Sequence, residues 1–460
     1  MSKIALIGGG GLRTPLLIYG LNQVRDRIDA QELVLYDADA ERAALMARLG
    51  DEIVAQNEGA LRIRVARSIQ DAVDGAAFVL NSIRVGGIAA RARDERIALE
   101  HGYPGQETTG PGGLAMALRT IPVILDQARA VERYSPQAWF ISFTNPAGLI
   151  TQALTDHTSL RVAGICDTPT ELFHRIALAL ASPPFDVECE YFGLNHLGWV
   201  RRIRLHGQDV TDRVFGSDAL LRSLYSSNLF DPALIRNLSL IPTEYLFFYY
   251  AQRKALENQR KAGVTRGEEI ARMNKTLLSD LGSSTPAKAV ALYVNYLNQR
   301  SGSYMKLEAE AGSAFTDQST PPEDPFQSAT GYHRIALSVM EALISSTPQR
   351  VVVNVRNQGA IDDLSADDVV EVPCSISRTG IVPQPVGKLP DSVRGLVLAV
   401  KAYERAAIRA AIECSIERAQ TALLLYPAVG EWEPARALLD ALIQSDPEHL
   451  GYLRNPVAVS

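Results

Sequence analysis

The first half of the chain alternates short apolar runs with longer segments that have the hydrophobic pattern of helices. The apolar runs each end in glycine or polar residues and are Lys3–Ile7, Leu33–Tyr36, Ala77–Ile83, Ala138–Phe143 and Val162–Ile165. The helical segments between them include Thr14–Arg27 and Leu118–Tyr134. This alternation is typical of βαβ units, in which helices cover both faces of a parallel sheet. It predicts an α/β fold with a Rossmann-like, doubly wound parallel sheet and ligand-binding groups at the carboxyl ends of its strands.

After about Asn195 the alternation stops. Residues 210–310 are charged and mostly helical in pattern, and Thr316–Ser328 is a probable loop rich in Pro, Ser, Thr and acidic residues. Further helices are indicated at Tyr332–Ser345 and Pro390–Tyr426, and strands at Arg350–Asn354 and Val369–Val372. We therefore predict a Rossmann-like domain over residues 1–195 and a second domain over residues 196–460. The second domain is mixed α/β but mostly helical, completes the active site and forms an oligomer interface.

Composition and charge narrow the class of protein. The chain has 460 residues, 47% of them hydrophobic, and a net charge of −6, which is ordinary for a globular protein. It shows no basic stripe for nucleic acid, no apolar stretch of about 18 residues for a membrane span and no signal-peptide pattern. The cysteines are few, widely spaced and without a CxxC pair: Cys166, Cys189, Cys374 and Cys414. We expect free thiols in a reducing compartment and hence a cytoplasmic enzyme.

Four consecutive glycines, Gly8, Gly9, Gly10 and Gly11, lie between the first predicted strand and helix. Glycines at this place let the backbone approach a pyrophosphate at the helix N-terminus, where free N–H groups favour anions. Asp37 ends the second strand, where a carboxylate can accept hydrogen bonds from a ribose. A tight turn without a ligand is the alternative, because Arg13 or Thr14 occupies the third glycine position of GxGxxG. We favour NAD binding, with Asp37 selecting NAD over NADP.

A second group of candidates follows later strands. Cys166 and Asp167 follow one strand, and His196 follows another apolar segment. A thiolate and an imidazole at strand ends could hold a divalent metal with positions open for substrate oxygens. Taken singly, Cys166 is more often a buried small residue, Asp167 a helix cap and a lone histidine structural. Spacing alone leaves these alternatives open.

The remaining candidates also have ordinary structural interpretations. Glu107 lies in a glycine-rich loop, GQETTGPGG, and Asn145 in a turn, FTNPAG. Arg91 follows RVGG on a charged helix that could be a solvated face. Tyr245 belongs to an aromatic cluster with Tyr249 and Tyr250, which by itself indicates hydrophobic packing.

Together, these motifs resemble glycoside hydrolase family four, the NAD- and metal-dependent phospho-glycosidases. In chain order they are the glycine run, RVGG with Arg91, GQETTGPGG, FTNPAG, GICD, GLNHL, and a tyrosine followed about twenty residues later by Thr265–Glu268. The resemblance extends to VVVNVRNQGAI and VEVP in the C-terminal region. Seven ordered motifs are much more specific than any one of them.

The resemblance implies roles for the catalytic and metal-binding residues. Cys166 and His196 would bind the metal, commonly Mn²⁺. Asp167 would protonate the leaving group, Tyr245 would remove the proton from C2 of the sugar, and Glu107 would raise the basicity of the tyrosine. We choose Tyr245 over its two neighbours because it lies 21 residues before Arg266, close to the family spacing.

Substrate-binding roles are implied for Arg91, Asn145 and Arg266, the arginines being suited to a 6-phosphate. The implied mechanism is oxidation at C3 by NAD⁺, deprotonation at C2, elimination at C1, addition of water and return of the hydride. The net reaction is hydrolysis, with a 6-phospho-β-glucoside as the first choice of substrate. The expected partners are an anionic glycoside and further copies of the chain, in a homodimer or homotetramer.

Several alternatives stay open. Asp167 after Cys166 resembles the α-type members, so a 6-phospho-α-glucosidase is a close second. A 6-sulfo sugar such as sulfoquinovose could replace the 6-phosphate. A malate-type net dehydrogenase and a non-catalytic NAD-binding sensor would share the dinucleotide-binding fold.

Overall fold

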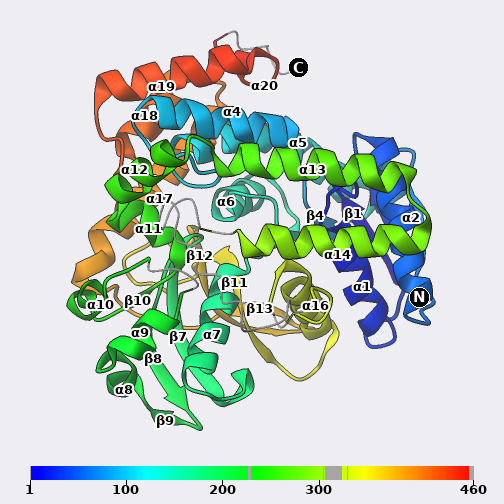
Figure 1. Ribbon diagram of the computed structural model, residues 1–460, viewed down its shortest axis with the longest axis horizontal. Coiled ribbons are helices and arrows are strands. Elements are labelled where there is room, and N and C mark those ends of the chain that lie inside the picture. The colour runs from blue at the N-terminus through cyan, green and yellow to red at the C-terminus, as the bar shows by residue number, and fades with distance from the viewer. Residues whose placement is uncertain (1, 226–228, 304, 306–323, 329, 455–460) are drawn as a thin grey trace.

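The computed structural model describes residues 2–225, 229–303, 305, 324–328 and 330–454. Its main sheet has nine strands in the order β13-β12-β11-β6-β5-β4-β1-β2-β3. The six at one end are mutually parallel and are β1 (Ser2–Ile7), β2 (Ala30–Tyr36), β3 (Arg62–Val65), β4 (Ala76–Asn81), β5 (Trp139–Ser142) and β6 (Arg161–Gly164). The chain runs outward from β1 in both directions, which is the order of a doubly wound dinucleotide-binding sheet. The predicted parallel sheet is therefore present (Figure 1).

Helices connect the parallel strands: α1 (Thr14–Val24), α2 (Ala40–Gln56), α3 (Ile69–Val73), α4 (Gly87–Glu100), α5 (Gly110–Tyr134), α6 (Ala147–His157) and α7 (Thr168–Ala179). Their starts follow local rules, since proline stands in the first turn of α1, α5 and α7, and Asp39 caps α2 by accepting the Arg42 N–H at 2.9 Å. We did not predict β3. It is a short edge strand in which arginines alternate with Ile63 and Val65, so it has no continuous apolar run.

Strands from the C-terminal half extend the same sheet. They are β11 (Gln349–Arg356), β12 (Val369–Ser377) and β13 (Gly380–Pro383), all antiparallel to their neighbours. β11 joins the parallel strands where Asn354 lies opposite Gly164 of β6. The predicted strands at 350–354 and 369–372 are thus confirmed. The sheet nevertheless crosses the boundary predicted at residue 195, and the division into two domains stays a prediction.

A hairpin that the pattern did not predict lies at that boundary. β7 (Val187–Leu194) and β8 (Leu197–Leu205) pair antiparallel up to Leu194 and Leu197, so that a two-residue turn separates them. The short strands β9 (Gln208–Asp209) and β10 (Ile241–Pro242) complete this second sheet. The hairpin escapes prediction because one end of each strand is buried continuously and the turn contains neither glycine nor proline.

The rest of the C-terminal half is mostly helical, as predicted. The helices before β11 are α8 (Thr211–Phe215), α9 (Asp218–Ser223), α10 (Pro232–Leu238), α11 (Phe247–Tyr250), α12 (Gln252–Ala262), α13 (Arg266–Ser283), α14 (Pro286–Gly302) and α16 (Tyr332–Ile344). Figure 1 shows α13 and α14 side by side across one face of the molecule. Of the loop predicted at 316–328, residues 316–323 lie outside the described residues.

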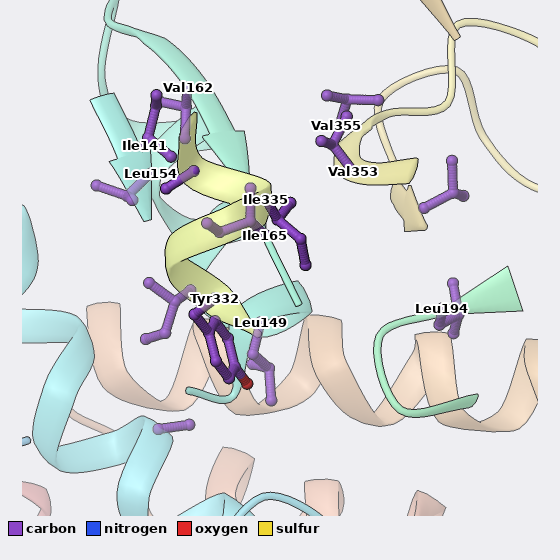
Figure 2. Packing of buried hydrophobic residues seen from close by; sticks show 14 of the residues in the cluster. Ile141, Leu149, Leu154, Val162, Ile165, Leu194, Tyr332, Ile335, Val353 and Val355 are labelled. Atoms are coloured by element: carbon purple, nitrogen blue, oxygen red, sulfur yellow. The ribbon is translucent and has the colours of Figure 1, made fainter. Parts of the chain in front are cut away.

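Four helices follow β13: α17 (Asp391–Ile412), α18 (Ile416–Leu425), α19 (Trp432–Ser445) and α20 (Pro447–Leu450). The single long helical region predicted at Pro390–Tyr426 is therefore two helices, with Cys414 in the left-handed region at φ 53° between them. One hydrophobic core joins both halves of the chain. Figure 2 shows part of it, where Ile141 and Val162 of the parallel strands share the core with Ile335 of α16 and with Val353 and Val355 of β11.

Candidate functional site

The glycine run forms a tight loop between β1 and α1. Gly8 has φ +92°, and a Cβ there would lie 2.2 Å from the carbonyl oxygen of Ser82, so only glycine fits. No side chain among the described residues caps α1, and although the Thr14 N–H already donates to the Gly11 carbonyl, the four glycines have no side chain that would keep a pyrophosphate from the loop backbone. The loop therefore fits the pyrophosphate of a dinucleotide.

Asp37 lies beside this loop at the end of β2. Its Oδ2 accepts the Gly10 N–H at 2.8 Å, and its Oδ1 accepts the Asp39 N–H at 2.9 Å. The guanidinium of Arg42 lies 3.8 Å from the same carboxylate. The structure thus places Asp37 next to the glycine loop, as a ribose-binding position requires. Its hydrogen bond to Gly10 also stabilises the conformation of the loop.

Cys166 and His196, 30 residues apart in the chain, meet in the structure. Cys166 follows the end of β6, and His196 lies in the turn between β7 and β8 with φ +59°. The Cys166 Sγ lies 3.4 Å from the His196 Nε2, and each residue is only 2% exposed. This is the juxtaposition that a shared metal ion needs and that spacing alone could not establish.

The protonation states of this pair suit a divalent cation. Burial lowers the pKa of His196 to about 3, so the imidazole is neutral and offers a lone pair. Burial also raises the pKa of the Cys166 thiol, and a bound divalent cation would compensate by stabilising the thiolate. A soft sulfur ligand beside an imidazole suits Zn²⁺ or a similar ion, and oxygen ligands from substrate or water in the open positions would suit Mn²⁺. The two residues therefore fit a metal site with positions open for other ligands.

The three neighbouring tyrosines have different surroundings. The ring of Tyr245 stacks on the His196 ring, with centroids 3.7 Å apart and planes 10° from parallel. Tyr249 instead packs against Tyr426 at 5.8 Å, and burial raises its pKa well above the usual value. Burial raises the pKa of Tyr250 to about 12. Of the three, Tyr245 is the one placed against a proposed metal ligand.

Glu107 and Arg91 form a buried charged pair next to this centre. The Glu107 carboxylate forms ion pairs with the Arg91 Nη1 at 3.0 Å and with the Arg84 Nη2 at 2.6 Å, and Arg91 also contacts Glu95 of its own helix at 2.8 Å. Burial alone would raise the pKa of Glu107, but the cations of Arg84, Arg91 and Arg300 outweigh it and hold the pKa at about 2. Glu107 is therefore a fixed anion that orients two arginines.

Asp167 occupies the N-cap position of α7, yet its side chain makes no capping hydrogen bond. It faces Arg13, whose Nη1 lies 3.7 Å away, and Arg13 in turn lies over the ring of Tyr332 at 4.4 Å. The Tyr332 hydroxyl lies 3.9 Å from the Cys166 Sγ. Burial raises the pKa of Asp167, although 31% of its side chain contacts solvent. A carboxyl group in this environment is suited to giving up a proton.

The other two predicted substrate-binding residues lie at different depths. Asn145 follows β5, and its Oδ1 is a buried acceptor without a hydrogen-bond partner among the described residues. Arg266 begins α13, where it pairs with Glu269 and donates to the Ser303 Oγ at 2.6 Å and to the Arg300 carbonyl at 2.7 Å. The next residue, Gly267, donates its N–H to Glu95 at 2.5 Å. The Arg266 guanidinium is therefore already hydrogen-bonded to protein groups. Glu95 links the start of α13 to Arg91.

Comparison with known proteins places this chain in a family. The model described as the family 4 glycosyl hydrolase matches residues 3–181, and that of the family 4 C-terminal domain matches residues 191–429, more than half of the chain. The chain belongs to glycosyl hydrolase family 4. A relative from Bacillus subtilis, named "Probable 6-phospho-beta-glucosidase", is 32% identical over 99% of this chain and 98% of its own length. The family predicted from the ordered motifs is confirmed, and with it the class of enzyme.

Solved structures of family 4 members have the same fold. The 6-phospho-β-glucosidase of Thermotoga maritima, determined with manganese, NAD⁺ and glucose-6-phosphate, is 27% identical with a TM-score of 0.81 and covers 98% of this chain and 99% of that one. A 6-phospho-α-glucosidase from gut microorganisms, in complex with NAD and glucose-6-phosphate, is 28% identical with a TM-score of 0.78 and covers 97% of this chain and 98% of that one. The predicted fold class is thereby confirmed.

Several residues of this family 4 site were not predicted from the sequence. Arg84 and Arg300 act on Glu107, and Arg13 and Tyr332 lie beside Asp167 and Cys166. The one available signal was Arg13, which stands where the dinucleotide fingerprint has its third glycine. Arg300 and Tyr332 come from helices far along the chain, so only the tertiary fold reveals them.

The low pKa of Glu107 makes a prediction about stability. A carboxylate with a native pKa near 2 and an ordinary unfolded pKa contributes stability above about pH 4.5, and loses it as the pH falls toward 2. The contribution at neutral pH is on the order of 3 kcal/mol. We expect Glu107→Gln to lower the melting temperature at pH 7 and to lower it much less at pH 3. An equal deficit at both pH values would contradict the assigned pKa.

None of the helices in the described part of the chain combines the length and apolar character needed to cross a membrane. The four cysteines are all free in the structure. The free cysteines agree with the free thiols that their number and spacing predict.

Proposed function

We propose that this family 4 protein hydrolyses the O-glycosidic bond of 6-phosphorylated glucosides, with a 6-phospho-β-glucoside as the first candidate, and that it uses NAD and a divalent metal such as Mn²⁺. The observation that carries the proposal is the buried Cys166–His196 pair with Tyr245 stacked on it. The names and ligands of the relatives from Bacillus subtilis and Thermotoga maritima support the substrate and cofactors.

When bound, the cofactors would supply the redox and Lewis-acid chemistry, which is a hydride acceptor for C3 that is regenerated at the end of the cycle and a cation that polarises the sugar carbonyl. Gly8–Gly11 and Asp37 would hold the dinucleotide, and Cys166 and His196 the metal. Tyr245 then needs only to remove the proton from C2, which the neighbouring carbonyl has made acidic. Arg91 and Arg13 carry positive charge within electrostatic range of Tyr245.

Asp167 would protonate the departing oxygen when the C1–O bond breaks. Its burial favours the protonated form, and Arg13 keeps the carboxyl group in place. Glu107 would act through Arg84 and Arg91, whose orientation it fixes, and it stays ionised throughout the cycle. Asn145 would offer its unpaired Oδ1 to a sugar hydroxyl.

The anomeric preference is the finer part of the proposal. The α-glucosidase from gut microorganisms resembles this chain about as well as the β-glucosidase of Thermotoga maritima. A panel of α- and β-nitrophenyl glycosides, each with and without a 6-phosphate and assayed with NAD⁺ and Mn²⁺, separates the two. The proposal predicts cleavage of the phosphorylated β-glucoside, and cleavage of the α-anomer alone would replace it with the second candidate. A 6-sulfonate analogue in the same panel tests the identity of the anion.

We predict that Arg266→Ala raises KM for the phosphorylated glycoside, which requires the Arg266 guanidinium to exchange its contacts with Glu269 and Ser303 for the phosphate. Losing a charge-assisted hydrogen bond to an anion costs roughly 1.5–3 kcal/mol, or about 10- to 150-fold. An unphosphorylated glycoside should be almost unaffected. Arg272→Ala, an exposed arginine on the same helix, is the matched control and should leave KM unchanged. Equal turnover of both glycosides by the wild type would refute the assignment of an anionic substrate.

Two further points belong to this proposal. A cytoplasmic location is supported by the free cysteines. A homodimer or homotetramer stays a prediction, for which the exposed apolar side chains are candidate contacts: Leu178, Phe185, Val382 and Trp432. A net dehydrogenase would release NADH in step with product, and a sensor would turn nothing over. Absorbance of NADH during turnover distinguishes the net dehydrogenase from a glycosidase, and metal-dependent release of product distinguishes the sensor from a glycosidase.

A further inference from the structure

A buried carboxylate that plays no part in the chemistry above lies behind the proposed metal ligands. Glu371 on β12 is 1% exposed and accepts three hydrogen bonds. The donors are the Tyr191 hydroxyl at 2.6 Å, the Asn195 Nδ2 at 3.1 Å and the Asn354 Nδ2 at 2.9 Å. A buried carboxylate with a full set of donors rigidifies the elements that supply them.

Two of these donors lead directly to the metal ligands. Asn195 precedes His196 in the turn between β7 and β8. Asn354 lies opposite Gly164 at the point where β11 joins β6, with its Nδ2 3.5 Å from the Gly164 carbonyl, two residues before Cys166. Glu371 is therefore the point at which the segments carrying the two ligands are tied together.

The third donor lies on β7, the strand that leads into the His196 turn, but it is five residues before His196 in the chain. Tyr191 lies within β7, and its hydroxyl lies against Gly198, where an added Cβ would come within 1.9 Å of it. Gly164 is equally crowded, since a Cβ there would lie 2.0 Å from the Thr151 Oγ1 and 2.9 Å from the Asn354 Cβ. The close packing leaves these side chains one arrangement, so a change at Glu371 is transmitted to the segments it holds.

We propose that Glu371 is a positioning residue that fixes the separation and orientation of Cys166 and His196 through Asn354 and Asn195. The inference rests on the proposed metal ligands. Residues that orient metal ligands typically change metal affinity by about 10- to 100-fold when they are replaced. Hydrogen bonding is the means, so a neutral side chain of the same shape should serve.

Titration with Co²⁺ alone tests this, because a cysteine thiolate bound to Co²⁺ gives a near-ultraviolet charge-transfer band that requires no substrate turnover. We expect Glu371→Ala and Asn195→Ala to raise the Kd for Co²⁺ by about 10- to 100-fold. Glu371→Gln should stay within about threefold of the wild type, because its carbonyl oxygen can accept from both asparagines while its amide donates to the Tyr191 oxygen.

Tyr191→Phe is the matched control. It removes a hydrogen bond to the same carboxylate but severs neither ligand-bearing segment, so it should change the Kd by no more than about twofold. NAD⁺ binding reports the folded fraction of each variant. If Glu371→Ala fails to bind NAD⁺ and is therefore misfolded, the Kd values of Asn195→Ala and Glu371→Gln for Co²⁺ still test the role of Glu371.

The outcomes separate this inference from the proposal on which it rests. If Cys166→Ser keeps the charge-transfer band, the ligand assignment fails. If Cys166→Ser loses the band while Asn195→Ala binds Co²⁺ like the wild type, only the role of Glu371 fails. A loss of Co²⁺ affinity in Tyr191→Phe as large as that in Asn195→Ala would also overturn the role of Glu371, because it would show a general effect on the hydrophobic core.

Discussion

Cys166→Ser and His196→Ala are each expected to abolish metal-dependent hydrolysis while NAD⁺ binding persists. The two side chains face each other at 3.4 Å from separate segments, so removing either leaves one buried ligand, which cannot hold a divalent ion in place. Polarisation by a metal supplies several kcal/mol at the transition state, so the expected loss in kcat/KM is at least about 10³-fold. The glycine loop lies on β1 and α1 and should be unaffected.

Cys374→Ser is the matched control for the cysteine. Cys374 is as buried as Cys166, but its thiol donates to the Val372 carbonyl at 3.4 Å, which a serine hydroxyl can also do. Chelation of the wild type should reproduce the loss, and added Mn²⁺ should reverse it. Reductant must be present, since oxidation of a thiol ligand would mimic the variants. Full activity in metal-free buffer with a chelator would refute the metal site.

The sequence pattern predicts five of the six parallel strands, because each of those five contains a continuous apolar run next to a helical segment. It fails at β3 and at the hairpin of β7 and β8, for opposite reasons. β3 is exposed and keeps only two partly buried apolar residues, whereas the hairpin has continuously buried stretches and a turn without glycine or proline. The pattern also does not predict which strands pair when they are far apart in the chain. It predicts the strand at 350–354, but not that this strand pairs with β6.

The candidate site divides in the same way. Cys166 and Asp167 could be found because they follow a predicted strand, and the ordered family motifs point to His196 and Glu107. The charge states and hydrogen-bonding partners of these residues depend on contacts between segments that are distant in the sequence. Glu107 is a permanently charged anion only because Arg84 and Arg91 meet it, and Glu371 reaches the metal ligands only through strands that pair in three dimensions.

Hydrolysis in D₂O is expected to place deuterium at C2 of the released sugar. The proposed mechanism requires Tyr245 to remove the C2 proton after oxidation at C3, and solvent then exchanges with that proton. Direct displacement at C1 by a carboxylate or by water never touches C2 and predicts no deuterium there. Mass spectrometry or proton NMR of the product sugar measures the incorporation. Substrates labelled with deuterium at C2 or C3 should react more slowly to the degree that those steps limit the rate.

Tyr245→Phe keeps the stacked ring on His196 but removes the phenolic oxygen, so exchange at C2 and hydrolysis should be lost together. General acid–base groups contribute about 10²- to 10⁴-fold, which sets the expected decrease in kcat. Tyr249→Phe and Tyr250→Phe, from the same cluster, should retain both activities. If one of them loses exchange and Tyr245→Phe retains it, the mechanism stands with a different base. If the wild type cleaves substrate and no deuterium enters C2, the elimination mechanism fails for this protein, whatever residues surround the sugar.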